Sequence, residues 1–316
     1  MTPIPQKSRV ASAQSAKTAD AASARGNGSA CKGVRAWAGV RPVSWTVDGE
    51  RLHGLHHLPA GPVRGAVVAV HGFNSDLREM VGLPAALARA GWHVLAFDQR
   101  GFGQSEGERG LTTAARAVAD IRSALDQLPK GLPVALVGHS LGAAYSLETA
   151  AEDRRVRAVV AAHPVDRLFD ELNPIEKAGY HVLGRIAEAR RRKGKSGGTI
   201  PFKIKEKDLF VDPAAVARAK EAGFLLRKVN LGNYRNALTF SGAMAAHRVE
   251  VPALVLTSAA DRVVRPAHQR RVFEAIPGRS TLLEHAGGHS CFGDRDADAL
   301  IASVAAWLES HVGAAA

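Results

Sequence analysis

The stretch Gly-His-Ser-Leu-Gly at residues 138–142 decides the fold of this chain. It follows the apolar run 133–137 and precedes a segment of helical composition, 143–148. A Gly-x-Ser-x-Gly between a strand and a helix is typical of a nucleophile elbow, a turn so tight that the residues flanking the serine must lack a Cβ. The helix N-terminus beside the Ser140 hydroxyl would favour negative charge. These residues therefore predict a serine nucleophile.

Apolar runs that alternate with helical segments predict the rest of the fold. Unbroken apolar strands are typical of a parallel sheet covered by helices, and strand–helix alternation favours right-handed crossovers and a doubly wound α/β sheet. Two alternating segments joined by Asp48-Gly49 predict an antiparallel hairpin at its N-terminal end. The expected strands are 43–47, 51–58, 66–70, 94–97, 134–137, 156–162, 253–256 and 280–283, and the expected helices are 83–90, 114–128 and 297–312.

Two segments stand outside this alternation. Residues 163–250 interrupt the strands but have helical composition at 175–192 and 214–226. An insertion over the carboxyl ends of the strands, where open α/β sheets bind ligands, would form a helical lid. Residues 1–34 are basic and contain few large apolar residues, so we expect a disordered tail followed by one α/β domain over 35–316.

The formal net charge of +12 over 316 residues raises the question of a nucleic-acid partner. Residues 1–41 hold seven Lys and Arg against one Asp, and a second basic run occupies 190–195. Such runs are usually solvated surface, and binding to single strands would need interleaved aromatic residues. We expect no nucleic-acid partner. Attraction to an anionic lipid surface is the functional alternative, and no pattern here indicates an oligomeric state.

The cysteine content and the N-terminus bear on the compartment. Two cysteines, Cys31 and Cys291, make no disulfide framework, and no apolar run approaches the length of a membrane span. The chain is therefore expected in the cytoplasm. The alternative is an organelle, because an Arg- and Ser-rich, acid-poor N-terminus is also typical of a transit peptide.

A serine hydroxyl needs a base to activate it, and the base needs a carboxylate to orient it. Asp261 follows the expected strand 253–256, and His289 follows the last expected strand after a double glycine that lets the loop curl back. The chain order Ser140, Asp261, His289 is the order of the nucleophile-elbow enzymes. His285 is the alternative base, and Asp98 precedes Ser140, so it lies in the wrong place for the acid.

An anionic intermediate would need two backbone N–H donors aimed at one point. One is expected from Leu141, the residue after the nucleophile. The other is expected from Phe73, because His71-Gly72 lets the chain turn at the end of the strand 66–70. The glycine-containing segment 98–105 lacks the spacing of a P-loop, so we expect a structural loop tied by Asp98 and Arg100.

Together, these motifs resemble the α/β-hydrolase superfamily over residues 43–312. Within it, the pattern is similar to the monoacylglycerol lipase and lysophospholipase-like serine hydrolases. The resemblance implies an α/β-hydrolase fold with Ser140 as nucleophile, Asp261 as acid and His289 as base, and with Phe73 and Leu141 as the oxyanion hole. It implies no cofactor and no metal.

The expected reaction is hydrolysis of a carboxylic ester through an acyl-enzyme, with a medium acyl or lipid-like small molecule as substrate. Leu168, Phe169 and Phe224 would line the apolar floor of the lid. A thioesterase or acyltransferase would use the same triad. A peptidase acting on N-terminal residues would also do so, and would need acidic groups, such as Asp166 with residues 170–171, to hold the amine. A non-catalytic binding module is disfavoured by the complete triad.

Overall fold

The sheet that carries the expected strands forms the centre of the molecule. The computed structural model describes residues 8–10, 39–167, 173–233, 236 and 239–312. Within this part of the chain the sheet has nine strands in the order β1-β11-β10-β7-β6-β4-β5-β3-β2. Pairing is antiparallel between β2 and β3 and between β3 and β5, and parallel elsewhere. The strands are β1 (Ser8–Val10), β2 (Val40–Val47), β3 (Glu50–His57), β4 (Gly65–Val70), β5 (Trp92–Asp98), β6 (Val134–His139), β7 (Val156–Ala162), β10 (Ala253–Thr257) and β11 (Ser280–Glu284).

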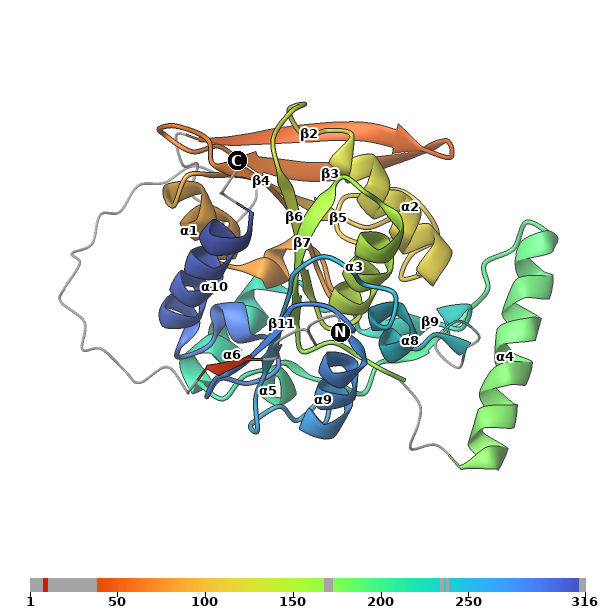
Figure 1. Cartoon of the computed structure of the whole chain (residues 1–316). Coiled ribbons are helices and arrows are strands. Elements are labelled where there is room, and N and C mark those ends of the chain that lie inside the picture. The colour runs from red at the N-terminus through yellow and green to blue at the C-terminus, as the bar shows by residue number, and fades with distance from the viewer. Residues whose placement is uncertain (1–7, 11–38, 168–172, 234–235, 237–238, 313–316) are drawn as a thin grey trace, which may run out of the picture.

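Helices cover both faces of this sheet (Figure 1). Successive residues of β4 enter opposite cores: Val68 packs with α2 and α3, whereas Val67 packs with α1 and α10. This two-sided burial explains the unbroken apolar runs. Within the described residues, no helix is both long and apolar enough to cross a membrane. The covering helices are α1 (Leu83–Arg89) and α10 (Ala297–His311) on one face, and α2 (Ala114–Leu125), α3 (Leu141–Glu152), α8 (Gly242–Ala246) and α9 (Pro266–Ala275) on the other.

The insertion between β7 and β10 forms a separate group of short elements. Its α4 lies at the periphery of the molecule (Figure 1). The remainder has a small apolar core of its own, which includes Phe210 and Phe224. The elements ahead of α8 are α4 (Pro174–Arg192), β8 (Thr199–Pro201), α5 (Glu206–Leu209), α6 (Pro213–Ala222) and β9 (Lys228–Asn230), and two 3-10 helices, η1 (Leu77–Met80) and η2 (Cys291–Gly293), lie outside the insertion.

Asp166 closes the base of the insertion. Its carbonyl oxygen accepts the N–H of Gly242 at 2.8 Å, and its carboxylate accepts the Ser241 hydroxyl at 2.7 Å. Arg271 of α9 forms an ion pair with the same carboxylate at 3.1 Å. The chain therefore leaves and re-enters the body at one hydrogen-bonded point, which we call the Asp166 clamp.

The predicted doubly wound sheet, the N-terminal hairpin and the three predicted helices are confirmed, with ends that differ by a few residues. Other elements differ from expectation, among them β8, β9, α5 and α8, which no sequence pattern predicted. Helix α6 ends at Ala222 instead of 226, because Gly223 adopts φ 61° and ends the helix. Helix α9 was not expected at all. Ser8–Val10 of the expected disordered tail pairs with the open edge of β11, and the rest of residues 1–34 lies outside the described part of the chain.

Candidate active site

Ser140 lies at the turn between β6 and α3. Its backbone has φ 55° and ψ −121°, a conformation that residues with a Cβ adopt only under strain. A Cβ on Gly138 would lie 2.5 Å from the carbonyl oxygen of Gly142. A Cβ on Gly142 would lie 2.2 Å from the carbonyl oxygen of His71. Close backbone approach therefore requires glycine on both sides of the serine.

Ser140, His289 and Asp261, which are far apart in the sequence, meet at the carboxyl ends of the strands. The Nε2 atom of His289 lies 3.0 Å from the Ser140 Oγ, and its Nδ1 lies 2.8 Å from the Asp261 Oδ2. All three residues are buried. A carboxylate only accepts hydrogen bonds, so His289 donates from Nδ1 and keeps Nε2 free to accept the serine proton.

Asp261 is held by more donors than His289 alone. Its Oδ1 accepts the backbone N–H groups of residues 263–264 at 2.8 and 2.9 Å. Its Oδ2 also accepts His163 Nδ1 at 2.6 Å and Gln269 Nε2 at 2.8 Å. Burial alone would raise the pKa of Asp261, but His289 and His163 outweigh it and hold that pKa well below its usual range. The carboxylate is therefore fixed as an anion.

A buried ion pair lies behind the elbow. The Nε2 atom of His139 lies 2.7 Å from the carbonyl oxygen of His289, which can only accept, so this nitrogen carries a proton. The other ring nitrogen, Nδ1, lies 3.2 Å from the Glu79 Oε2. Burial opposes charge on both groups, yet their attraction lowers the pKa of Glu79 to about 2 and raises the pKa of His139. The Glu79 carboxylate therefore favours the protonated form of His139.

Glu79 also fixes the segment that carries one expected oxyanion donor. Its Oε2 accepts the Gly72 N–H at 2.7 Å, and a Cβ on Gly72 would lie 3.1 Å from the Ser140 Cβ. The N–H of Phe73 follows directly. Within the described residues, neither this N–H nor that of Leu141 donates a hydrogen bond. Both remain available to a bound oxyanion.

The loop that follows β5 is structural, as its sequence predicts. The Asp98 carboxylate accepts the N–H groups of Leu77 and Gln104, each at 2.9 Å. The Arg100 side chain is buried and forms a 2.5 Å ion pair with Asp120. Neither side chain is free to bind a phosphate.

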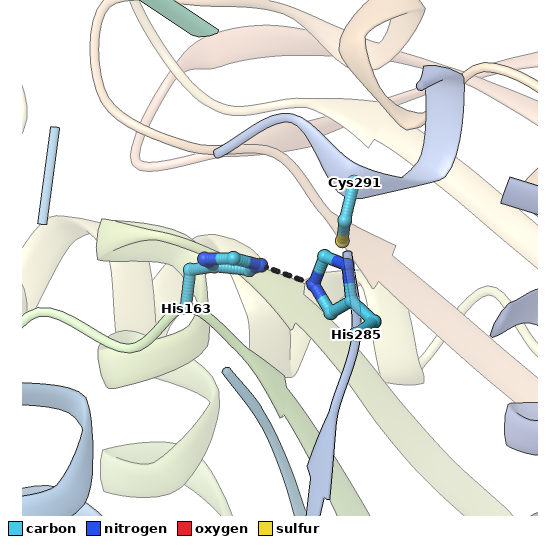
Figure 2. A group of neighbouring side chains, drawn as sticks. All are labelled: His163, His285 and Cys291. Atoms are coloured by element: carbon cyan, nitrogen blue, oxygen red, sulfur yellow. Dashed lines mark hydrogen bonds between the residues drawn. The ribbon is translucent and has the colours of Figure 1, made fainter. Parts of the chain in front are cut away.

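His285, the alternative base, contacts His163, whereas the ring that contacts Ser140 is that of His289. The His285 Nε2 lies 2.7 Å from the Nε2 of His163, and Figure 2 shows the two rings meeting at these nitrogens with the Cys291 sulfur beside His285. The three ligand atoms lie within 4.8 Å of one another, a donor set that would suit zinc or copper. However, 2.7 Å is a hydrogen-bond distance, and burial raises the pKa of the Cys291 thiol well above its usual value. The cluster therefore fits hydrogen-bonded imidazoles beside a neutral thiol.

Sequence reasoning missed three polar residues that contact the candidate triad or its elbow: His163, Gln269 and Glu79. His163 directly follows the apolar run of β7, so the rule that found Asp261 at the end of its strand could also have found His163. Glu79 lies in a four-residue 3-10 helix and has no comparable signal, because its partners are distant in the sequence.

Comparisons with known proteins agree with this fold. An uncharacterised 31.7 kDa protein of Escherichia coli is 27% identical over 286 residues, which cover 81% of this chain and 94% of the relative. A polyketide transferase of Stachybotrys chlorohalonatus is 28% identical over 278 residues, which cover 80% of this chain and 91% of the relative. The crystal structure of a monoacylglycerol lipase from Paleococcus ferrophilus superimposes with a TM-score of 0.71 and 28% identity, and covers 82% of this chain and 99% of that one.

A family model described as Hydrolase_4, serine aminopeptidase S33, matches residues 61–296. That span includes all three candidate triad residues and the whole insertion. The match covers most of the chain, and monoacylglycerol lipases are among the relatives. The chain therefore belongs to the Hydrolase_4 family of the α/β-hydrolase superfamily.

Proposed function

We propose that this protein is a serine hydrolase of small carboxylic esters. The observation that carries the proposal is the continuous contact from the Ser140 Oγ through the His289 ring to the Asp261 carboxylate, at 3.0 and 2.8 Å. This is the geometry in which a serine hydroxyl loses its proton to an oriented imidazole.

The proposed reaction has two halves. In the first, Ser140 Oγ bonds to the ester carbonyl carbon while His289 Nε2 takes its proton, and the oxyanion is held by the N–H groups of Phe73 and Leu141. The intermediate then collapses, the ester C–O bond breaks, and His289 protonates the departing alcohol. In the second half, water gives a proton to His289 Nε2 and bonds to the acyl carbon; the bond from that carbon to Ser140 Oγ then breaks, His289 returns the proton to Oγ, and the carboxylic acid leaves.

The insertion would act as the lid that selects the substrate. Its Phe202 ring packs edge-on against Phe73 at 5.9 Å between centroids, and the carbonyl oxygen of Leu209 accepts the N–H of Ser290 at 2.9 Å. It therefore contacts both sides of the reacting centre. Phe224 of the expected apolar floor is buried in the core of the insertion, and residues 168–169 lie outside the described part of the chain. An apolar medium acyl or lipid-like ester fits the aromatic side chains of Phe73 and Phe202, where the insertion meets the site.

Acyl transfer is the second candidate function, and the similarity to a polyketide transferase favours it. The same acyl-enzyme would form, and an acceptor alcohol, amine or thiol would replace water in the second half. A peptidase has less support from the residues expected to hold an amine. Asp166 is engaged by Ser241 and Arg271, and residues 170–171 lie outside the described chain.

The outer helix of the insertion would bring the protein to lipid substrates. In α4, Ile175, Val182 and Ile186 are exposed, and the helix ends in the basic run 190–192. Apolar side chains beside positive charge favour the surface of an anionic membrane. We expect the protein to co-sediment with anionic phosphatidylglycerol vesicles and not with phosphatidylcholine vesicles. Equal binding to both kinds of vesicle would contradict a role for the basic run 190–192.

The test of the triad is the variant Ser140→Ala. We expect it to lose labelling by a fluorophosphonate probe and to lose turnover of p-nitrophenyl esters. Ser303→Ala is the control, because the Ser303 hydroxyl contacts only its own helix α10 at the surface. Persistent labelling of Ser140→Ala would remove the nucleophile from the proposal. A rate series over acyl length, run with a thioester and an aminoacyl amide, and with and without an acceptor alcohol, then separates esterase, thioesterase, peptidase and transferase.

A further inference from the structure

His163 occupies a costly position beside the candidate triad. It is fully buried and directly follows β7, and its backbone has φ 50°. A left-handed conformation is unfavourable for a residue with a Cβ, and unusual backbone held at a site is a reason to ask what it positions. The conformation brings His163 Nδ1 within 2.6 Å of the Asp261 Oδ2, on an oxygen that also accepts from His289.

The hydrogen bonds determine where the protons lie. His163 Nδ1 faces a carboxylate oxygen and must carry a proton to bond to it. Burial lowers the pKa of His163 to about 3, so the ring is neutral and its Nε2 is an acceptor. The proton in the 2.7 Å contact between the two Nε2 atoms therefore belongs to His285. In the neutral form of His285 the Nδ1 is then an acceptor, and the N–H of Gly287 lies 3.1 Å from it.

The opposite assignment fails. Asp296 Oδ2 lies 3.5 Å from His285 Nδ1 and could accept a proton from it. His285 Nε2 would then be an acceptor, and His163 would need protons on both nitrogens to bond to His285 and Asp261. A doubly protonated ring contradicts the lowered pKa of His163. The Asp296 oxygen instead accepts the N–H of Ala286 at 2.9 Å.

We propose that His163 is a positioning residue for the triad acid: His285 fixes its tautomer, and its Nδ1–H holds the Asp261 carboxylate in line with His289. This inference rests on the proposed function, because it assigns His163 a part in the same site. Within the described residues, the hydrogen bond that His163 makes to the triad goes to Asp261, and its ring also packs edge-on against that of His289 at 5.5 Å between centroids.

Removing the Nδ1–H donor of His163 should make the His289 ring more basic. Asp261 would keep its charge with one charge-assisted hydrogen bond fewer, so it would attract the Nδ1 proton of His289 more strongly and make that ring more basic. Among the described titratable groups, His139 also lies near the His289 ring, with ring centroids 4.7 Å apart and Glu79 behind it. Those groups, and Asp296 with Cys291 beside His285, stay unchanged in a His163 variant.

Two variants separate positioning from mere packing. His163→Ala deletes the donor. His163→Asn keeps an N–H donor at the same distance from the backbone, and asparagine tolerates φ 50° better than most residues. With p-nitrophenyl acetate as substrate, kcat/KM should fall at low pH, where His289 becomes protonated; we call this part of the pH profile the acid limb. We expect His163→Ala to move the midpoint of the acid limb to a pH higher by roughly half to one unit, and to lower kcat about tenfold. His163→Asn should restore the acid limb.

An acid limb that stays in place in His163→Ala, with only Tm lowered, would overturn the proposal, as would an Asn variant that behaves like Ala. If His163→Ala does not fold, ¹⁵N-histidine NMR of the unmodified protein still decides. We expect a proton on Nδ1 of His163 and on Nε2 of His285, and the opposite tautomers would refute the inference. Failure of the proposed function would be separate: Ser140→Ala would keep its turnover, whatever the tautomers.

Discussion

Replacing Glu79 with glutamine tests the buried ion pair behind the elbow. One oxygen of Glu79 serves both the Gly72 N–H at 2.7 Å and His139 Nδ1 at 3.2 Å. A glutamine oxygen in the same place could still accept from both donors, but glutamine carries no negative charge, so the ion pair with His139 is lost. The fall of the Glu79 pKa from its ordinary 4.5 to about 2 corresponds to about 3 kcal/mol of stabilisation. We expect Glu79→Gln to lose about this much free energy of unfolding.

The difference in free energy of unfolding between the unmodified protein and Glu79→Gln should depend on pH. Because the folded-state pKa of Glu79 is lowered, its stabilisation is complete above pH 4.5 and is lost as the pH falls toward 2. Because the pKa of His139 is raised, its contribution is complete below the ordinary 6.5 and is lost as the pH rises through its folded-state pKa. The stability gap between the two proteins should therefore be largest between pH 4.5 and 6.5.

Urea unfolding followed by tryptophan fluorescence from pH 3 to 8 measures the gap. Glu309→Gln is the matched control, because it makes the same change in a pair with Arg64 in which both side chains are about half exposed. Such a surface pair contributes at most about 1 kcal/mol. A gap for Glu79→Gln that is as small as the control, or that does not change with pH, would refute the ion pair.

Two further predictions concern the packing around the site. Gly142→Ala places a Cβ 2.2 Å from the carbonyl oxygen of His71, so we expect it to lower the free energy of unfolding by about 3 kcal/mol or more and to lower kcat. Gly61→Ala is the control, because its Cβ meets nothing within 4 Å, and it should change the thermal unfolding little. Cys291 is buried and the pKa of its thiol is raised, so in a Cys31→Ser background DTNB should react only as urea unfolds the chain; fast reaction of the folded protein would contradict that burial.

Local patterns in the sequence were enough to predict the sheet and to choose the three residues that the structure brings together. Apolar runs predict buried strands, and the carboxyl ends of parallel strands meet at one edge of the sheet. A polar residue just after such a run is therefore a candidate for the same site. This reasoning selected Asp261 after β10 and His289 after β11, and the contacts of His289 with Ser140 and with Asp261 follow from that topology.

Contacts that depend on tertiary geometry left no such pattern. Glu79 reads as an ordinary acidic residue of a short helix, and only the folded chain shows that it reaches Gly72 and His139. His163 also follows an apolar run directly, but it is the first residue of the segment 163–250 that the sequence assigns to the insertion. The tautomer of His163 depends on His285, 122 residues away, so no local rule could assign it. Sequence patterns predict strands better than they predict the hydrogen bonds between their ends.

The Asp166 clamp has a consequence for how this protein can evolve. Because the clamp ties the two ends of the insertion together, a change in the length of the chain between Asp166 and Ser241 leaves those ends in place. Lengthening a closed loop is inexpensive, and each doubling costs only about 0.6 kcal/mol of entropy. The insertion can therefore change in length at little entropic cost, whereas its contacts with Phe73 and Ser290 must be kept or replaced.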